Sequence, residues 1–166
     1  MRRGLEKDVK EAEKIYCQAK RRMKEAGLNQ WQGPYPSGED FLSDVGKGQA
    51  YVWEEHGKLV GLAACILGEE KTYRKIQGGW TYPGSYLTIH RLAIGDEGLG
   101  KGLSYEIFRE IQRAFEGKVD NIRIDTHREN IPMQKILKNL DYRYAGVIQV
   151  VDGSDRDAFE KELRKK

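Results

Sequence analysis

The most informative stretch of the sequence lies between Tyr86 and Phe115, where the hydrophobic pattern changes from that of a strand to that of a helix. Residues 86–94 read Tyr-Leu-Thr-Ile-His-Arg-Leu-Ala-Ile, and their β-branched and apolar side chains predict a strand. From Leu103 the apolar residues recur at helical spacing: Leu103, Ile107, Phe108, Ile111 and Phe115. Four glycines lie between the two segments: Gly95, Gly98, Gly100 and Gly102. The sequence therefore predicts a strand, a glycine-rich loop and a helix in succession.

A glycine-rich junction of this kind suits an anion. Glycines leave the backbone bare of side chains, and the first amides of a helix have no acceptor within the helix. These amides and the positive end of the helix dipole both favour phosphate oxygens. A tight turn that needs glycine only for its geometry is the alternative interpretation. The strand before the loop and the amphipathic helix after it favour a phosphate site.

A nucleotide triphosphate site fits this loop poorly. Residues 95–101 match the pattern G-x-x-x-x-G-K, but Gly102 stands where the phosphate loop of an NTPase needs Ser or Thr to bind magnesium. Only 64 of the 166 residues follow Gly102, which is too few for the strands that such a domain adds after its first. The sequence therefore argues against an NTPase.

Length and composition predict one globular domain, residues 1–166, in the cytoplasm. The sequence has no apolar run long enough to cross a membrane and no apolar signal core near Met1, so we expect no membrane association. The formal charge is +3, but basic and acidic residues are interleaved, which argues against a nucleic-acid partner. Cys17 and Cys65 form no metal-binding motif, and we expect both to be buried free thiols with no metal.

The order of the predicted elements is that of an α+β protein built around one mixed sheet. We expect helices at residues 8–26 and 37–45, with Ser37 as the N-cap of the second, and a β-hairpin from strands at 49–55 and 58–67. An irregular segment with a helical turn near residues 72–76 leads to the strand at residues 86–94. After the helix that follows the glycine loop, the pattern predicts a strand at 121–127, a helix capped by Asn130, a strand at 142–151 and a terminal helix from Ser154 or Asp155.

Two segments resemble motifs of the GCN5-related N-acetyltransferases (GNATs). Residues 92–104 are similar to motif A, whose loop reads Gln/Arg-x-x-Gly-x-Gly/Ala; Gly102 matches its central glycine, whereas Leu99 and Ser104 replace its first and last positions. Residues 130–142 are similar to the family's Asn-x-x-Ala…Leu-Tyr…Leu-Gly-Phe, with Asp141 in place of the turn glycine. Residues 89–94 and 125–130 also resemble a bacterial subgroup of these enzymes. The likeness extends over nearly the full chain and implies an α/β/α fold, a mostly antiparallel mixed sheet flanked by helices.

The resemblance implies an acetyltransferase that moves the acetyl group of acetyl-CoA, its co-substrate, to a primary amine of a small molecule or a protein. The backbone N–H of Leu92 matches the family's oxyanion donor. The residues implied to bind acetyl-CoA are Leu92, Ala93, Ile94, Leu99, Gly100, Lys101, Gly102, Leu103, Ser104, Asn130 and Met133. The same fold without the chemistry, a non-catalytic acyl-CoA-binding module, is the alternative.

The catalytic groups are less well determined by the sequence. His90 is our candidate for the general base, because imidazole titrates near neutral pH, although a strand histidine can equally be a hydrogen-bonded core residue. Glu69, Glu70 and Asp125 are reserve bases. The family's acid, a tyrosine, falls at Leu137, so Tyr142, Tyr144 or a water would protonate the leaving thiolate.

The acceptor site is predicted from aromatic and acidic residues. Trp31, Tyr35 and Trp80, with Glu70 and Asp125 nearby, would wall a pocket that favours a cationic amine. Aromatics that only cover the core are the alternative. A monomer and a homodimer are both compatible with the sequence.

Overall fold

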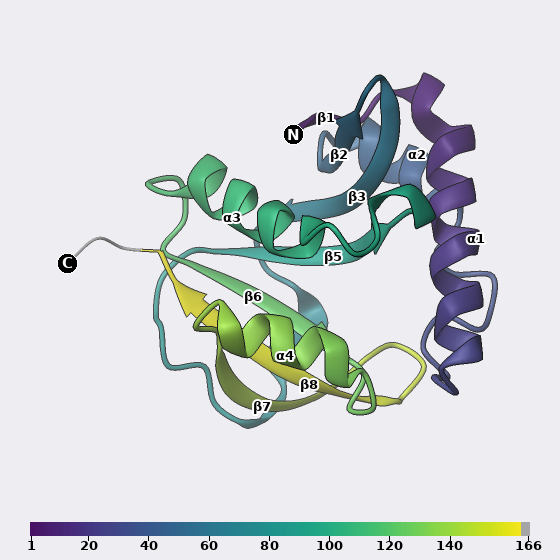
Figure 1. Ribbon diagram of the computed structural model, residues 1–166. Coiled ribbons are helices and arrows are strands. Elements are labelled where there is room, and N and C mark those ends of the chain that lie inside the picture. The colour runs from purple at the N-terminus through teal and green to yellow at the C-terminus, as the bar shows by residue number, and fades with distance from the viewer. Residues whose placement is uncertain (164–166) are drawn as a thin grey trace. The chain divides into compact units, whose positions relative to one another are not determined.

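The computed structural model describes residues 1–163, and their contacts group into two compact units (Figure 1). The first unit comprises Met1–Cys65 and His90–Ile107, and the second comprises Ile66–Ile89 and the chain from Phe108 onward. Within residues 1–163, none of the helices has the length and apolarity that crossing a bilayer requires.

The strands form a mixed, mostly antiparallel sheet. In the first unit the hydrogen-bonded order is β1 (Arg2–Arg3), β2 (Ala50–Glu55), β3 (Lys58–Leu67) and β5 (Tyr86–Ile94), with β1, β2 and β3 antiparallel. In the second unit the strand order is β5, β6 (Asn121–Thr126), β8 (Asp155–Glu162), β7 (Arg143–Gln149) and β4 (Ile76–Gly78). The pairing of β5 with β6 is parallel and the other pairings of this unit are antiparallel. The parallel ladder joins only Tyr86–Thr88 to β6, so it ends before His90.

Two helices cover one face of the sheet in the first unit. Helix α1 (Val9–Glu25) follows a 3₁₀ turn at Glu6–Asp8, and α2 (Gly38–Gly46) begins at the N-cap Ser37, whose hydroxyl accepts from the amide of Asp40. The buried residues between these helices and the sheet are Ala12, Ile15, Tyr16, Ala19, Phe41, Ala50, Val52, Leu62 and Ala93. Gly61 faces the other side, where a Cβ would lie 2.9 Å from the end of the Ile107 side chain. The start of α3 (Leu103–Phe115) therefore packs on that opposite face.

The second unit buries a separate cluster around Tyr73, Ile148 and Ala158. Tyr73 comes from a 3₁₀ turn (Lys71–Arg74), and Trp80 packs on it with ring centroids 5.2 Å apart. Arg123 of β6 points to the same side, between the rings of Trp80 and Tyr86 at 4.3 and 4.0 Å. Burial lowers the pKa of the Arg123 guanidinium below its ordinary value. Cation–π contact with two rings compensates part of the cost of burying this charge.

A buried carboxylate organises the loop that precedes β5. Glu160 of β8 is completely buried, and its two oxygens accept from the amides of Thr81 and Tyr82 at 2.6 and 3.3 Å. Asn121 is also completely buried and donates to the carbonyls of Tyr82, Pro83 and Ser85. These side chains replace the regular hydrogen bonds that an irregular segment lacks.

Most predicted elements are confirmed, but the predicted terminal helix is wrong. Residues 155–162 form β8, which lies between β6 and β7 and pairs with both. Ala158 and Phe159 fit a helical pattern in isolation, but in the structure the extended backbone here pairs with β6 on one side and β7 on the other. No pattern in the sequence indicates β1 or β4, which are only 2 and 3 residues long. The expectation for the thiols is half right: Cys65 is buried, but Cys17 is exposed on α1.

One close backbone approach gives a stability prediction. Gly146 in β7 has a φ of 148°, and a Cβ added there would lie 2.2 Å from the carbonyl oxygen of Gln77 in β4. We expect Gly146→Ala to lower the free energy of unfolding by more than about 2 kcal/mol, because overlap with fixed backbone adds to backbone strain. Gly153→Ala is the control, because Gly153 has a φ of 81° but no atom within 4 Å of its added Cβ. Equal losses in urea unfolding of the two variants would contradict this account.

Candidate active site

The second half of β5 carries an unusual backbone conformation. Arg91 has a φ of 53°, a left-handed value that a residue with a Cβ rarely adopts inside a strand. The peptide that follows a left-handed residue turns away from the direction that the regular pleat would give it. The N–H of Leu92, the predicted oxyanion donor, belongs to that peptide. His90, the predicted base, is the half-buried residue immediately before it.

A buried ion pair holds the side chain of Arg91. Its Nε and Nη2 donate to the two carboxylate oxygens of Asp44 in α2, at 2.8 and 2.5 Å. Asp44 is 2% exposed and also accepts from Gln49 Nε2 at 2.8 Å. Nη1 of Arg91 donates to the hydroxyl of Tyr35 at 3.1 Å. Burial alone would lower the pKa of the Arg91 guanidinium, but the hydrogen bonds to Asp44 raise it above its ordinary value.

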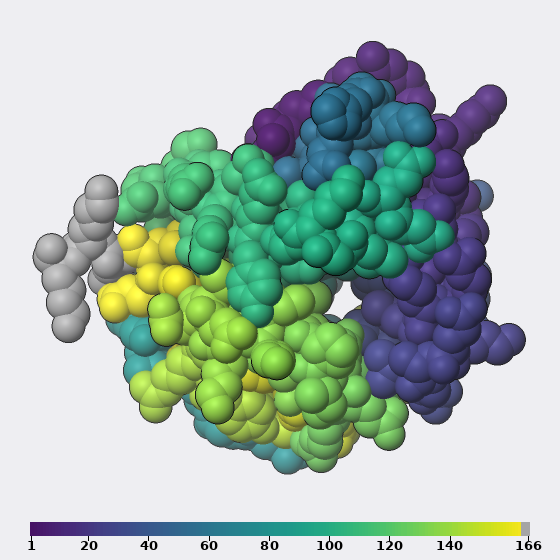
Figure 2. Space-filling model, in the orientation of Figure 1, coloured from purple at the N-terminus to yellow at the C-terminus, as the bar shows by residue number. Residues whose placement is uncertain are grey.

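The glycine loop is open at the positions that motif A predicts. Gly100 and Gly102 both have a φ of 74°, and a Cβ added at either would meet no atom within 4 Å. Residues 99–102 are exposed, and the space-filling view shows this part of the chain, in teal to green, at the surface (Figure 2). Successive amides around left-handed residues form concave nests that bind anions. The loop leads directly into α3, which begins at Leu103, so the helix dipole adds to the same attraction.

Helix α1 anchors the beginning of this loop. Arg21 Nη2 donates to Asp96 Oδ2 at 2.6 Å, and Arg22 donates to both Asp96 and the carbonyl of Ile94. The amide of Asp96 donates to Gln18 Oε1 at 3.0 Å. The hydrogen bond from Arg21, helped by the charge of Arg22, holds the pKa of Asp96 below its ordinary value. Three side chains of one helix therefore fix the point where β5 becomes the loop.

The other charges of the loop are also paired. Glu97 accepts from Lys58 Nζ at 3.4 Å, and Lys101 Nζ donates to Glu55 Oε2 at 2.8 Å. Pairing of both loop carboxylates with cations reduces the repulsion that a phosphate would meet here. The predicted phosphate loop contains two acidic residues, and each of them is paired with a cation.

In the second unit, Asp125 is paired with a buried phenol. The hydroxyl of Tyr73 donates to Asp125 Oδ1 at 2.6 Å, and Tyr73 is only 2% exposed. Burial raises the pKa of the Tyr73 phenol, so it remains a donor at neutral pH. Glu70 uses Oε1 to cap the following turn, accepting from the amide and hydroxyl of Thr72. Glu69 is paired with Arg74 through two hydrogen bonds of 2.6 and 2.7 Å.

Helix α4 (Ile131–Asn139) confirms the predicted capping by Asn130. The Oδ1 of Asn130 accepts from the amide of Met133 at 3.2 Å, and Pro132 lies in the first turn. Asp141, in place of the family's turn glycine, has the positive φ of 60° that this position requires. Leu137 is completely buried, so the position of the family tyrosine contributes to the core.

The tyrosine candidates for a general acid differ in their surroundings. Tyr142 is 5% exposed and packs edge-on against Phe108, with Lys161 Nζ 5.8 Å from its ring centroid. Tyr144 is 52% exposed and packs edge-on against Phe159. The position of Tyr142 is that of a core residue in the second unit, and Tyr144 is the more accessible of the two hydroxyl donors.

The predicted acceptor aromatics are distributed over both units. Within the first unit, Trp31 packs edge-on against Tyr16 at the margin of the core, and Tyr35 is exposed while it accepts from Arg91. Within the second unit, Trp80 packs against Tyr73 and Arg123, and its indole N–H donates to the carbonyl of Tyr73. Both the ring and the indole N–H of Trp80 are therefore engaged in contacts within the second unit. Among the five predicted acceptor residues Tyr35 is exposed, and the other four are half-buried.

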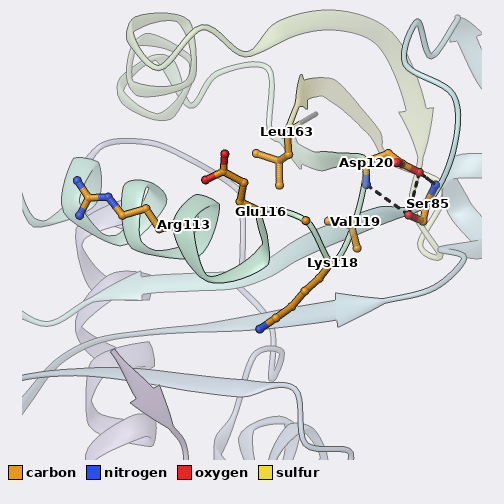
Figure 3. A pocket seen from close by; sticks show the side chains of 8 residues that line it. Ser85, Arg113, Glu116, Lys118, Val119, Asp120 and Leu163 are labelled. Atoms are coloured by element: carbon orange, nitrogen blue, oxygen red, sulfur yellow. Dashed lines mark hydrogen bonds between the residues drawn. The ribbon is translucent and has the colours of Figure 1, made fainter. Parts of the chain in front are cut away.

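A cavity of about 500 Å³ lies at the C-terminal end of α3 (Figure 3). It is lined by Ser85, Arg113, Glu116, Gly117, Lys118, Val119, Asp120 and Leu163. Ser85 and Asp120 are hydrogen-bonded to each other at its edge, as Figure 3 shows. The glycine loop, by contrast, directly precedes α3 in the chain. This cavity contains none of the predicted site residues.

Sequence reasoning missed Asp44 and the anchoring by α1. Asp44 follows Phe41 by three residues on the apolar side of a short helix, so its position alone signals a buried carboxylate that needs a cationic partner. The pairing of Arg21 and Arg22 with Asp96 spans about 75 residues of sequence and has no local signal.

Comparison with solved structures identifies the fold. A GNAT-family acetyltransferase from Streptococcus agalactiae has 33% sequence identity and a TM-score of 0.89, with 99% of this chain and 95% of that chain covered. A GNAT-family acetyltransferase from Listeria monocytogenes has 18% identity and a TM-score of 0.74, covering 98% and 93%. A proposed acetyltransferase from Salmonella typhimurium, solved with its cofactor acetyl-CoA, has 15% identity and a TM-score of 0.70, covering 99% and 94%.

Comparison by sequence alone does not identify a family. No family model matches the chain, and no curated protein sequence matches it. The mixed sheet and the open loop after β5 nevertheless define an acetyltransferase fold. The identity to the Streptococcus agalactiae protein over nearly the full length of both chains shows that this chain belongs to the GNAT acetyltransferase family.

The anchoring of the loop is testable without a ligand. We expect Asp96→Asn to accelerate amide hydrogen exchange in residues 95–102, because Arg21 and Arg22 lose their charged acceptor. The pKa of Asp96 in the folded state is below its ordinary value, so the ion pair contributes fully above the ordinary carboxyl pKa and is lost as the pH falls through the lower folded pKa. Acidification of the wild type should therefore reproduce the effect of the variant.

Glu97→Gln is the matched control for Asp96→Asn. Glu97 lies in the same loop but pairs only with the exposed Lys58 among the contacts described here, so its loss should leave the exchange nearly unchanged. Equal acceleration in both variants would show that any loss of charge loosens the loop.

Proposed function

We propose that this protein is an acetyl-CoA-dependent N-acetyltransferase that acts on a primary amine of a small molecule or a protein. The observation that carries the proposal is the open loop at Gly100 and Gly102, at the junction of β5 and α3, in a chain of the GNAT family. The loop fits the diphosphate of CoA because it offers backbone donors, the start of a helix and carboxylates that are already paired with cations.

The co-substrate would supply the acetyl group as a thioester. The amine nitrogen forms the new C–N bond, the C–S bond breaks, and CoA leaves as a thiol. For this reaction the chain must supply a base for the ammonium proton, a donor for the carbonyl oxygen and a proton for the thiolate.

His90 and the N–H of Leu92 are proposed for the first two tasks. The conformation of Arg91 supports the second assignment, because it sets the direction of the Leu92 amide. His90 is next to Arg91 and half-buried, which leaves it accessible to a proton directly or through water. Asp125 remains the reserve base, and its bond from Tyr73 keeps it fixed.

The proton for the thiolate has no donor at the family position, because Leu137 is buried. A water or Tyr144 is proposed for this task, with Tyr142 the less accessible candidate. The same observation favours one alternative function, a non-catalytic acyl-CoA-binding module. Location in the cytoplasm and a monomeric or homodimeric state are further predictions from the sequence.

The phosphate site predicts a specific loss of binding. We expect acetyl-CoA to raise the melting temperature of the wild type and Mg-ATP to leave it unchanged, because only the former fits the loop. Gly102→Asp should abolish acetyl-CoA binding in calorimetric titration, since its carboxylate would face the diphosphate. Retained affinity in this variant would discard the loop as the phosphate site.

Gly117→Asp is the matched control for Gly102→Asp. Gly117 has a φ of 77° and no atom within 4 Å of its added Cβ, almost the same backbone situation as Gly102. It lies just beyond the other end of α3, so we expect this variant to bind acetyl-CoA as the wild type does. The pair separates loss of the phosphate site from backbone strain and from added charge.

The base assignment predicts a change in turnover without a change in binding. With any amine that supports CoA release, His90→Ala should lower the turnover number by about 10²–10⁴-fold while acetyl-CoA affinity stays the same. Unchanged turnover across pH would reduce His90 to a packing residue, and acetyl-CoA binding without turnover of a broad amine panel would favour the binding module.

A further inference from the structure

We propose that the ion pair between Asp44 and Arg91 is a positioning device, which aims the Leu92 N–H at the acetyl carbonyl by holding residue 91 in its left-handed conformation. The inference rests on the proposed function and assigns a role to two residues that contribute no atom to the reaction itself. It concerns only the first unit, which contains both residues and Leu92.

The left-handed conformation of Arg91 needs a cause. A residue with a Cβ pays roughly 1–2 kcal/mol for this region, and Gly, Asn or Asp would pay less. The sequence places none of these three at position 91. Strain that a chain retains where a smaller residue would remove it is typical of functional sites. The strained residue here immediately precedes the amide that the family resemblance assigns to the carbonyl oxygen.

The contacts of the guanidinium supply the cause. Asp44 receives two hydrogen bonds from it in a fork-to-fork arrangement, and Tyr35 receives a third at 3.1 Å. Side chains of the pair are 14% and 3% exposed, so water competes little for either charge. The three side-chain nitrogens of Arg91 are thus fixed by two other segments, which contain Asp44 and Tyr35. These contacts restrict the position of the Arg91 Cα and the range of its φ. The pair thus holds the strained backbone in place.

The anchor of this pair is itself rigid. Asp44 lies in α2, whose start is fixed by the cap at Ser37, and Gln49 donates to the same carboxylate. Phe41, in the preceding turn of the helix, is buried in the core of the first unit. Asp44 is therefore a fixed point against which Arg91 is held.

Stability alone is a weak reason to keep such a pair. A buried ion pair commonly adds little compared with apolar residues of the same volume, because desolvation offsets the attraction. Geometric precision is a better-attested use of a bidentate arginine–carboxylate contact. The position next to the predicted oxyanion donor is where such precision would matter for the reaction.

The test uses two double variants that differ only in what residue 91 tolerates. Asp44→Asn/Arg91→Gly and Asp44→Asn/Arg91→Ala both remove the ion pair and leave no unpaired charge. Glycine accepts a φ of 53° without strain, whereas alanine does not. We therefore expect the glycine variant to keep the Leu92 amide in place and the alanine variant to lose it.

The readout requires no amine acceptor. The affinity for acetyl-CoA is compared with that for CoA, which lacks the carbonyl, in calorimetric titrations of each variant and the wild type. Loss of one hydrogen bond should weaken acetyl-CoA binding by about 3- to 10-fold in the alanine variant, with CoA affinity unchanged. The carbonyl ¹³C resonance of bound [1-¹³C]acetyl-CoA should move toward its free position in the same variant. The glycine variant should match the wild type in both measurements.

Each outcome decides the question. Wild-type behaviour of both variants would overturn the proposal, because the amide would then need no ion pair. Loss in both variants, with CoA affinity intact, would also overturn it, since the pair would act by another route than the backbone of residue 91. If the alanine variant does not fold, Asp44→Asn alone replaces it and should show the same direction of change. A wild type that binds neither acetyl-CoA nor CoA would refute the proposed function itself.

Discussion

The structure depends on a strand that changes its neighbours partway along its length. β5 pairs in parallel with β6 only from Tyr86 to Thr88, and its residues from His90 onward belong to the first unit. A strand that leaves one ladder must have its backbone groups and direction fixed by other means. The ion pair of Arg91 and the α1 contacts to Ile94 and Asp96 do this at two successive points. The loop that follows β5 can then be open to solvent, because the contacts with α1 already fix the residues at its start.

Charge is distributed in agreement with this arrangement. The loop carries Asp96 and Glu97, which would repel a diphosphate if they were free to face it. Each is held by a cation from another segment, and Arg21 and Arg22 bring two positive charges to the base of the loop. The same side chains thus anchor the loop and neutralise it. The loop sequence alone, with two acidic residues beside one lysine, does not show that both carboxylates are paired.

The terminal strand shows where reasoning from the sequence failed. The spacing of Ala158 and Phe159 was compatible with a helix, and a charged residue, Glu160, followed them. In the structure Glu160 is buried because it binds the backbone of the Thr81–Tyr82 segment, a partner about 80 residues earlier. A buried acid with a distant partner breaks the hydrophobic pattern on which element prediction relies. Cys17 is exposed for a different reason. On a helix that buries only one face, a residue next to the apolar stripe already faces solvent.

The sequence by itself determined the order of strand, glycine loop and helix, the cap at Asn130 and the resemblance to the acetyltransferases. These features depend on neighbours within a few residues, where the period of apolar side chains and the freedom of glycine act directly. Only the tertiary structure decided that Arg91 is left-handed, that Asp44 holds it, and that residues 155–162 form a strand. In each of these cases the free energy comes from groups far apart in the chain, whose contact no local pattern records.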